Sequence, residues 1–244
     1  SSDVCSSDLR NHFSPLTQIN ISNVKNLKLA WSYSSGGADT VNQTTQIQCN
    51  PIIIQGVMYG VSAGSQAFAV DAKSGREIWK TNIQEKTPSM NSRGVAFYSS
   101  PGQRSKIFFG YGSYLFALDA KTGKPVENFG QNGKINLLEG IKRPGSDDYT
   151  VLNTPISIYK NTLIVGTRVS ESAPALLGDI RAFDAISGRL IWTFHTIPKP
   201  GEYGYKTWEK NTPLHAFITI CTLLHRQCTY TNLIYASNDV HLKV

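Results

Sequence analysis

The chain has 244 residues, a length that suits one large domain or two small ones. Hydrophobic residues make up 40% and charged residues 17%, which excludes a disordered chain, because disorder requires low hydrophobicity and high net charge. The net charge of +7 comes from scattered Lys and Arg, so we expect a solvated basic surface and no nucleic-acid partner, and no apolar run reaches the length of a transmembrane segment.

Both ends of the chain differ from its middle. All 20 glycines lie between Gly36 and Gly204, so the middle is dense in turn residues. Residues 1–9 form an imperfect Ser-Ser-Asp tandem that looks like a non-native linker or adapter. Residues 212–244 lack glycine and the repeat described below, as a frameshifted tail would. We therefore expect the folded unit to span residues 10–211.

One pattern, Ala-x-Asp-x-x-Ser/Thr-Gly, occurs three times in the middle of the chain. The copies are AVDAKSGREIW (69–79), ALDAKTGKPVE (117–127) and AFDAISGRLIW (182–192). Short segments rich in β-branched and aromatic residues precede each copy, which favours strands. Repeats at such spacings are typical of solenoids and propellers.

Each part of the repeat has a physical role in a hairpin. The aspartate can accept backbone N–H bonds and nucleate a turn, and the glycine supplies the positive φ of a bulged hairpin. The aromatic residue at the end can pack on the neighbouring unit. We therefore predict an all-β fold, a partial β-propeller of about three to four blades. Residues 51–82, 93–130 and 151–196 should each form one antiparallel sheet of up to four strands.

The repeat resembles the tryptophan docking motif of the quinoprotein dehydrogenases, which are eight-bladed propellers that bind pyrroloquinoline quinone (PQQ). The segment Phe13–Leu29 is similar to the N-terminal signature of that family, and Phe194–Trp208 resembles its glucose-dehydrogenase-like branch. Some relatives carry a vicinal Cys pair where this chain reads Lys86–Pro88, which disfavours the alcohol-dehydrogenase branch.

The resemblance implies several cofactor-binding residues. Arg93, in an Arg-Gly-Val-Ala-Phe run, would pair with the carboxylates of PQQ; the alternative is a surface Arg that opens a strand. Gln48 stands where relatives often place a cofactor-facing Glu, and is equally compatible with a polar strand rim. Thr154, which precedes a proline, would also face PQQ.

The loop after Gly166 supplies the remaining candidates. Arg168 and Ser170 align with positions that touch PQQ in the family. Glu171 would give a carboxylate to the catalytic calcium, since Ca²⁺ prefers oxygen ligands; the alternative is an exposed loop Glu. His195 is expected to be hydrogen-bonded near a strand end, with proton transfer as the alternative. Trp31, Trp79 and Trp192 are expected to be structural.

The resemblance implies an oxidoreductase that moves a hydride from a sugar or alcohol to PQQ, with calcium polarising the quinone carbonyl. Electrons would pass to a cytochrome or quinone acceptor, in the periplasm. The family's general base, an Asp, belongs to a later blade, so no catalytic residue is assigned and we expect this fragment to be inactive. The alternative is a non-catalytic propeller scaffold of the kind that serves outer-membrane protein assembly.

Overall fold

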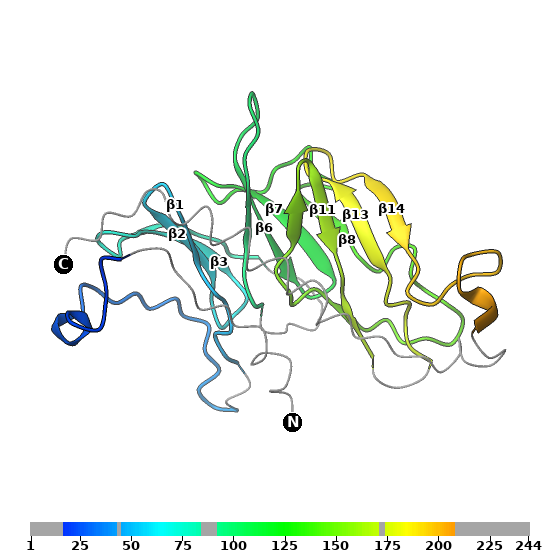
Figure 1. Cartoon of the computed structure of the whole chain (residues 1–244), viewed down its shortest axis with the longest axis horizontal. Helices are drawn as coiled ribbons and strands as arrows, with labels where there is room; N and C mark the ends of the chain where they lie inside the picture. Colours follow the sequence, from blue (N-terminus) through cyan, green and yellow to red (C-terminus); the bar gives the residue numbers. More distant parts are fainter. Residues whose placement is uncertain (1–16, 43–44, 84–91, 171–173, 208–244) are drawn as a thin grey trace.

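The computed structural model describes residues 17–42, 45–83, 92–170 and 174–207, and the regular secondary structure in these ranges is almost entirely antiparallel β-sheet, joined by long turns and irregular segments. Three sheets have four strands each and follow one another across the molecule in chain order (Figure 1). The helical structure in the same ranges is two short 3₁₀ helices, η1 (Val24–Asn26) and η2 (Tyr205–Thr207). No described helix is long and apolar enough to cross a membrane.

The three large sheets share one topology, in which each strand pairs with the next along the sheet. The first sheet contains β1 (Ile52–Ile54), β2 (Val57–Val61), β3 (Ala67–Asp71) and β4 (Glu77–Lys80). The second contains β5 (Ala96–Tyr98), β6 (Lys106–Tyr111), β7 (Tyr114–Asp119) and β8 (Lys134–Asn136). The third contains β10 (Ser157–Tyr159), β11 (Thr162–Val165), β13 (Ile180–Asp184) and β14 (Leu190–Phe194). A small fourth sheet pairs β9 (Thr150–Val151) with β12 (Arg168–Val169).

The three repeat turns have the same hydrogen bonds. In each, one carboxylate oxygen of the aspartate accepts bonds of 2.7–3.1 Å from the backbone N–H groups two and three residues later and from the Ser or Thr hydroxyl. The glycine N–H then donates to the aspartate carbonyl at 2.8 Å in all three copies. Each glycine has φ between +69° and +77°, as predicted, because a Cβ would disfavour this conformation.

Two of these turns receive a tryptophan from the preceding segment of the chain. Trp31 donates its indole N–H to the carbonyl of Ala72 at 3.1 Å, and Trp79 donates to Ala120 at 2.9 Å. Each ring lies directly on the turn glycine: a Cβ at Gly75 would come within 2.6 Å of Trp31, and one at Gly123 within 2.6 Å of Trp79. The structural role expected for these two tryptophans is confirmed.

The contact between the second and third sheets is made differently. Glu127 stands where the second repeat would have its tryptophan, and it is exposed. The buried Lys106 instead donates its ammonium to the carbonyls of Ala185 and Ile186, both at 2.9 Å. Ala185 corresponds in the repeat to Ala72 and Ala120, so a lysine takes the hydrogen-bonding place of the indole.

The prediction for the second sheet was wrong at its C-terminal boundary, because the fourth strand, β8, lies beyond residue 130. The segment after Gly123 makes only an isolated bridge, between Leu118 and Pro125. Proline has no N–H to donate, so it cannot continue a ladder. The chain turns at Phe129 and Gly130 and returns as β8, which pairs with β7.

The core lies between neighbouring sheets, and the second sheet is buried on both faces. Along β6, Ile107 and Phe109 belong to a cluster shared with the first sheet, while Phe108 belongs to a cluster shared with the third. This alternation follows from the two-residue period of a strand. The outer strand of the third sheet differs, because Leu190, Trp192 and Phe194 of β14 are 42–60% exposed.

Candidate functional site

The first strands of the three large sheets begin at one common end, which we call the first-strand end. The backbone N–H of Asn50 donates to the carbonyl of Arg93 at 3.1 Å, and the N–H of Arg93 donates to the carbonyl of Asn153 at 2.8 Å. These residues precede β1, β5 and β10 respectively, so two backbone bonds join the three sheets in a row. The Asp-Gly turns lie at the opposite end, the turn end, because each follows the third strand of its sheet.

Arg93 occupies the middle of this row. The residue is half-buried, and no side-chain hydrogen bond or ion pair of Arg93 is found among the described residues. Its neighbour Gly94 is packed tightly, since a Cβ there would lie 3.0 Å from Pro155. Gln48 lies at the same end but is exposed, and its amide donates to Gln46 at 3.1 Å.

The segment that carries Thr154 is paired with the segment that carries Arg168. Val151 and Arg168 are opposite each other in the β9–β12 ladder. The buried Thr154 donates its hydroxyl to the carbonyl of Gly166 at 3.4 Å, which ties the same two segments together. Arg168 and Ser170 are half-buried and follow the second strand of the third sheet, so they also lie at the first-strand end.

The structure therefore brings five sequence-predicted residues to one end of the sheets; they are Gln48, Arg93, Thr154, Arg168 and Ser170. Glu171 lies outside the described residues, as do the proposed linker 1–9 and tail 212–244. Sequence reasoning missed Asn153, a buried residue whose carbonyl fixes the backbone of Arg93. No spacing signal marks it, because its partner is 60 residues away in the chain.

The chemistry available at this end is cationic hydrogen bonding. Two guanidinium groups offer forked N–H donors, which match planar carboxylates. Within the described ranges no group of three or more His, Cys, Asp or Glu side chains could hold a metal ion. Cys49 is not a nucleophile candidate, because burial raises the pKa of its thiol to about 11, opposed by a hydrogen bond from the Val61 amide.

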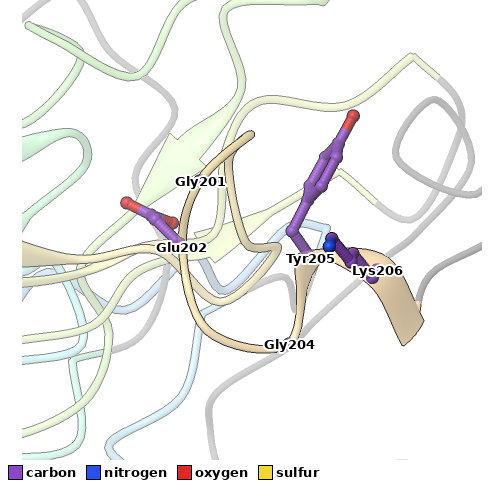
Figure 2. A pocket seen from close by; sticks show the side chains of 5 residues that line it. All are labelled: Gly201, Glu202, Gly204, Tyr205 and Lys206. Atoms are coloured by element: carbon purple, nitrogen blue, oxygen red, sulfur yellow. The ribbon is translucent and has the colours of Figure 1, made fainter.

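A shallow hollow of about 230 Å³ lies in the segment that follows β14 at the same end. Its lining comes from Gly201, Glu202, Gly204, Tyr205 and Lys206. Figure 2 shows the Glu202 carboxylate on one side of the hollow and the Tyr205 and Lys206 side chains, from η2, on the other. The hollow is open to solvent, so it does not enclose a cofactor-sized molecule.

Comparison with known proteins identifies the family. The family model described as PQQ, glucose/ethanol/alcohol dehydrogenase, beta-propeller domain, matches residues 4–217. The chain belongs to this family. Membership of this beta-propeller family accounts for the repeated four-stranded sheets.

Several characterised members are similar to this chain. It is 32% identical to quinoprotein glucose dehydrogenase A of Acinetobacter calcoaceticus, over 75% of this chain and 26% of that protein. It is 36% identical to the dehydrogenase subunit of the quinone-type alcohol dehydrogenase of Komagataeibacter europaeus, over 83% of this chain and 25% of that protein. The crystal structure of quinohemoprotein alcohol dehydrogenase from Comamonas testosteroni matches with a TM-score of 0.62 and 30% identity, over 77% of this chain and 26% of the other. The chain thus spans about a quarter of the length of these relatives.

The residues at the first-strand end fit a polycarboxylated cofactor. Arg93 is half-buried, and no side-chain hydrogen bond is found for it among the described residues. Arg168 lies in β12, which pairs with β9, and β9 is followed by Asn153, the backbone partner of Arg93. Partial burial strengthens a guanidinium–carboxylate pair, because water competes less for the donors. For calcium, the candidate ligand Glu171 lies outside the described residues, so the described structure offers no test of that fit.

Proposed function

We propose that this chain supplies one wall of the cofactor site of a PQQ-dependent dehydrogenase that oxidises a sugar or an alcohol. The observation that carries the proposal is the family match across residues 4–217, together with the gathering of Arg93 and Arg168 at one end of the sheets. PQQ, when bound, supplies the hydride-accepting quinone. A scaffold would not need two half-buried arginine residues at the same end.

In this proposal the chain's own residues bind and orient the cofactor. Arg93 and Arg168 pair with its carboxylates, and Ser170 and Gln48 donate hydrogen bonds at its edge. Thr154 contributes by joining its segment to Gly166 beside the site. Glu171 would ligate a calcium ion. The proton acceptor for the substrate hydroxyl comes from outside these residues, so the 244-residue chain alone should not turn over substrate.

We propose that the protein acts in the periplasm, as its resemblance to the quinoprotein dehydrogenases implies. We also propose that electrons pass to a cytochrome or quinone, because oxidation of an alcohol yields two electrons that the cofactor must pass on before the next cycle. The relatives include proteins named for glucose, glycerol and alcohol, so we propose the substrate class of sugars and alcohols without choosing one member.

The test is a titration of PQQ into the 244-residue chain, with and without Ca²⁺, in which binding is measured by the quenching of tryptophan fluorescence. We expect saturable binding that weakens as salt is added, since screening acts on ion pairs. Arg93→Ala and Arg168→Ala should each weaken binding about tenfold or more, because each removes a charge-assisted pair.

Two controls separate binding from stability. Arg76 is an exposed arginine at the turn end, so Arg76→Ala should leave the affinity for PQQ unchanged. Trp79→Ala should lower the free energy of unfolding more than it changes PQQ affinity, because Trp79 lies in the core between two sheets. Equal loss of affinity in Arg76→Ala and Arg93→Ala would contradict the site, and dye reduction by the chain alone would contradict its predicted inactivity.

A further inference from the structure

A small apolar cluster supports β12, the strand that carries Arg168. It joins Val169 of β12 to Ile141, from the loop between β8 and β9, and to two residues of the segment before β13. Ile141 is 1% exposed and Val169 is 3% exposed, so both are fully enclosed. Val169 stands between Arg168 and Ser170, and a shift of the cluster would therefore move both candidate cofactor-binding residues.

Arg181 of β13 holds the loop that carries Ile141. The residue is buried, and its guanidinium donates from Nη2 to the carbonyl of Leu137 at 2.7 Å and from Nη1 to that of Glu139 at 2.9 Å. Both carbonyls follow β8, beyond its ladder with β7, so they take their donors from a forked side chain. The carbonyl of Ile141 accepts a 3.2 Å bond from the Leu177 amide. The loop is thus tied down at three carbonyls.

The place of Arg181 in the third sheet connects it to β12 as well. Arg181 is opposite Val165 in the ladder between β11 and β13, and Val165 lies three residues before Arg168. Burial lowers the pKa of Arg181 to about 10, opposed by the carboxylates of Asp179 and Glu139, so the guanidinium remains charged at neutral pH. One side chain therefore fixes the loop that supports β12 and lies beside the strand that leads into it.

We propose that Arg181 is a positioning residue for the cofactor site, which holds residues 137–141 against β12 and so keeps Arg168 in place. The inference rests on the proposed function, because it assumes that Arg168 pairs with the cofactor. Arg93 is held by a different route, through its backbone bonds in the row along the first-strand end. Loss of Arg181 should therefore weaken the contribution of Arg168 to binding more than that of Arg93.

The test is a double-mutant cycle on the affinity of the 244-residue chain for PQQ, measured by tryptophan fluorescence. Arg181→Met should weaken binding about fivefold, a coupling typical of residues in one network. In the Arg168→Ala background the same change should have less than about a twofold effect, because the group that it displaces is gone. In the Arg93→Ala background the fivefold effect should remain. Arg181→Lys keeps the charge without the fork, so it should recover part of the affinity.

The matched control is Lys106→Met, which removes another buried cation that donates to two carbonyls. Lys106 lies at the turn end, so this change should lower stability without altering the affinity of the folded chain for PQQ. If Arg181→Met fails to fold, Ile141→Ala replaces it, because it weakens the support of Val169 and leaves the guanidinium in place. It should show the same dependence on Arg168.

Amide hydrogen exchange without PQQ separates this inference from the proposed function. Arg181→Met should lower the protection of residues 166–170 about fivefold, and Lys106→Met should leave it unchanged. Equal effects of Arg181→Met with and without Arg168 would overturn the inference, as would unchanged exchange at residues 166–170. A wild-type chain that binds no PQQ would instead contradict the proposed function, and with it the role of Arg181 in binding, while the exchange response would still report the support of β12.

Discussion

Lys106 shows how a single side chain replaces an aromatic ring at the interface between two sheets. Its ammonium bonds two carbonyls of the third sheet, and it lies 5.7 Å from the centre of the Phe129 ring and 5.9 Å from that of Tyr98. Burial lowers the pKa of Lys106, and Asp184 opposes this shift. The ammonium is thus retained in the core by its two acceptors and by the aromatic faces around it.

Replacing this lysine with an apolar residue should be costly. Lys106→Met keeps much of the side-chain length but leaves the carbonyls of Ala185 and Ile186 without their donor. We expect a loss of about 2 kcal/mol in the free energy of unfolding, since each unsatisfied buried acceptor is unfavourable. Urea denaturation measures the loss. Lys121→Met, at an exposed turn position, should stay within about 0.5 kcal/mol of the wild type; equal effects of the two variants would refute the role of Lys106.

The sequence could not reveal this substitution. The repeat marks Glu127 as the docking position, and nothing in its spacing points to Lys106, which lies on a different strand and contacts a carbonyl 79 residues away. The same limit applies at the candidate site. Arg93 is predicted from a local run of residues, whereas Asn153, whose carbonyl accepts the Arg93 amide, lies 60 residues away in the chain.

At the scale of one element, the Asp-Gly turn combines two separate constraints on its glycine. Gly75 has φ +71°, and Trp31 covers the space where a Cβ would stand. Gly102 has nearly the same φ, +74°, with nothing within 4 Å of a Cβ. Comparing Gly75 with Gly102 therefore separates the cost of backbone strain from the cost of displacing a packed ring.

Gly75→Ala should therefore destabilise the chain more than Gly102→Ala. The second change carries only the strain of a left-handed backbone, about 1 to 2 kcal/mol. The first also displaces the Trp31 ring, which should add about 2 kcal/mol and shift the tryptophan emission. Denaturant unfolding followed by fluorescence measures both effects. Equal losses in the two variants would show that the ring adjusts without cost.

Elements with local chemistry were predictable, and those with long-range partners were less so. The strands that flank each turn were predicted because alternating residues and the Asp-Gly pair lie within a few positions of one another. Register shifts follow Ala69 and Ala182, in the first and third copies, in agreement with the bulged hairpin that the turn glycine predicts. The strand β8 was missed for two reasons. Pro125 interrupts the expected strand after the turn, and the fourth strand is formed instead by Lys134–Asn136, which lie beyond the repeat.

At the scale of the whole molecule, the outer strand of the third sheet carries a row of exposed apolar side chains among the described residues. Leu190, Trp192 and Phe194 line β14 and are 42–60% exposed. Apolar edge strands promote association between chains. We expect the 244-residue chain to self-associate with increasing concentration, as measured by sedimentation velocity.

Charged substitutions on β14 should reduce this association. Phe194→Glu and Leu190→Glu should each shift the sedimentation profile toward the monomer. Ile21→Glu, at a residue that is 97% exposed on the N-terminal segment, should have a smaller effect. A wild-type chain that stays monomeric at high concentration, or an equal response to Ile21→Glu, would show that β14 is not the contact.

The hydrogen bonds of Trp31 and Trp79 span the same distance along the chain, which bears on the order in which the sheets can form during synthesis. Trp31 reaches Ala72 and Trp79 reaches Ala120, in both cases 41 residues further along the chain. At these two positions the tryptophan ring is therefore covered by a turn that is synthesised about forty residues later, before translation ends. The first two sheets can thus dock one after the other during synthesis, whereas the turn of the third sheet is reached by Lys106, 79 residues earlier in the chain.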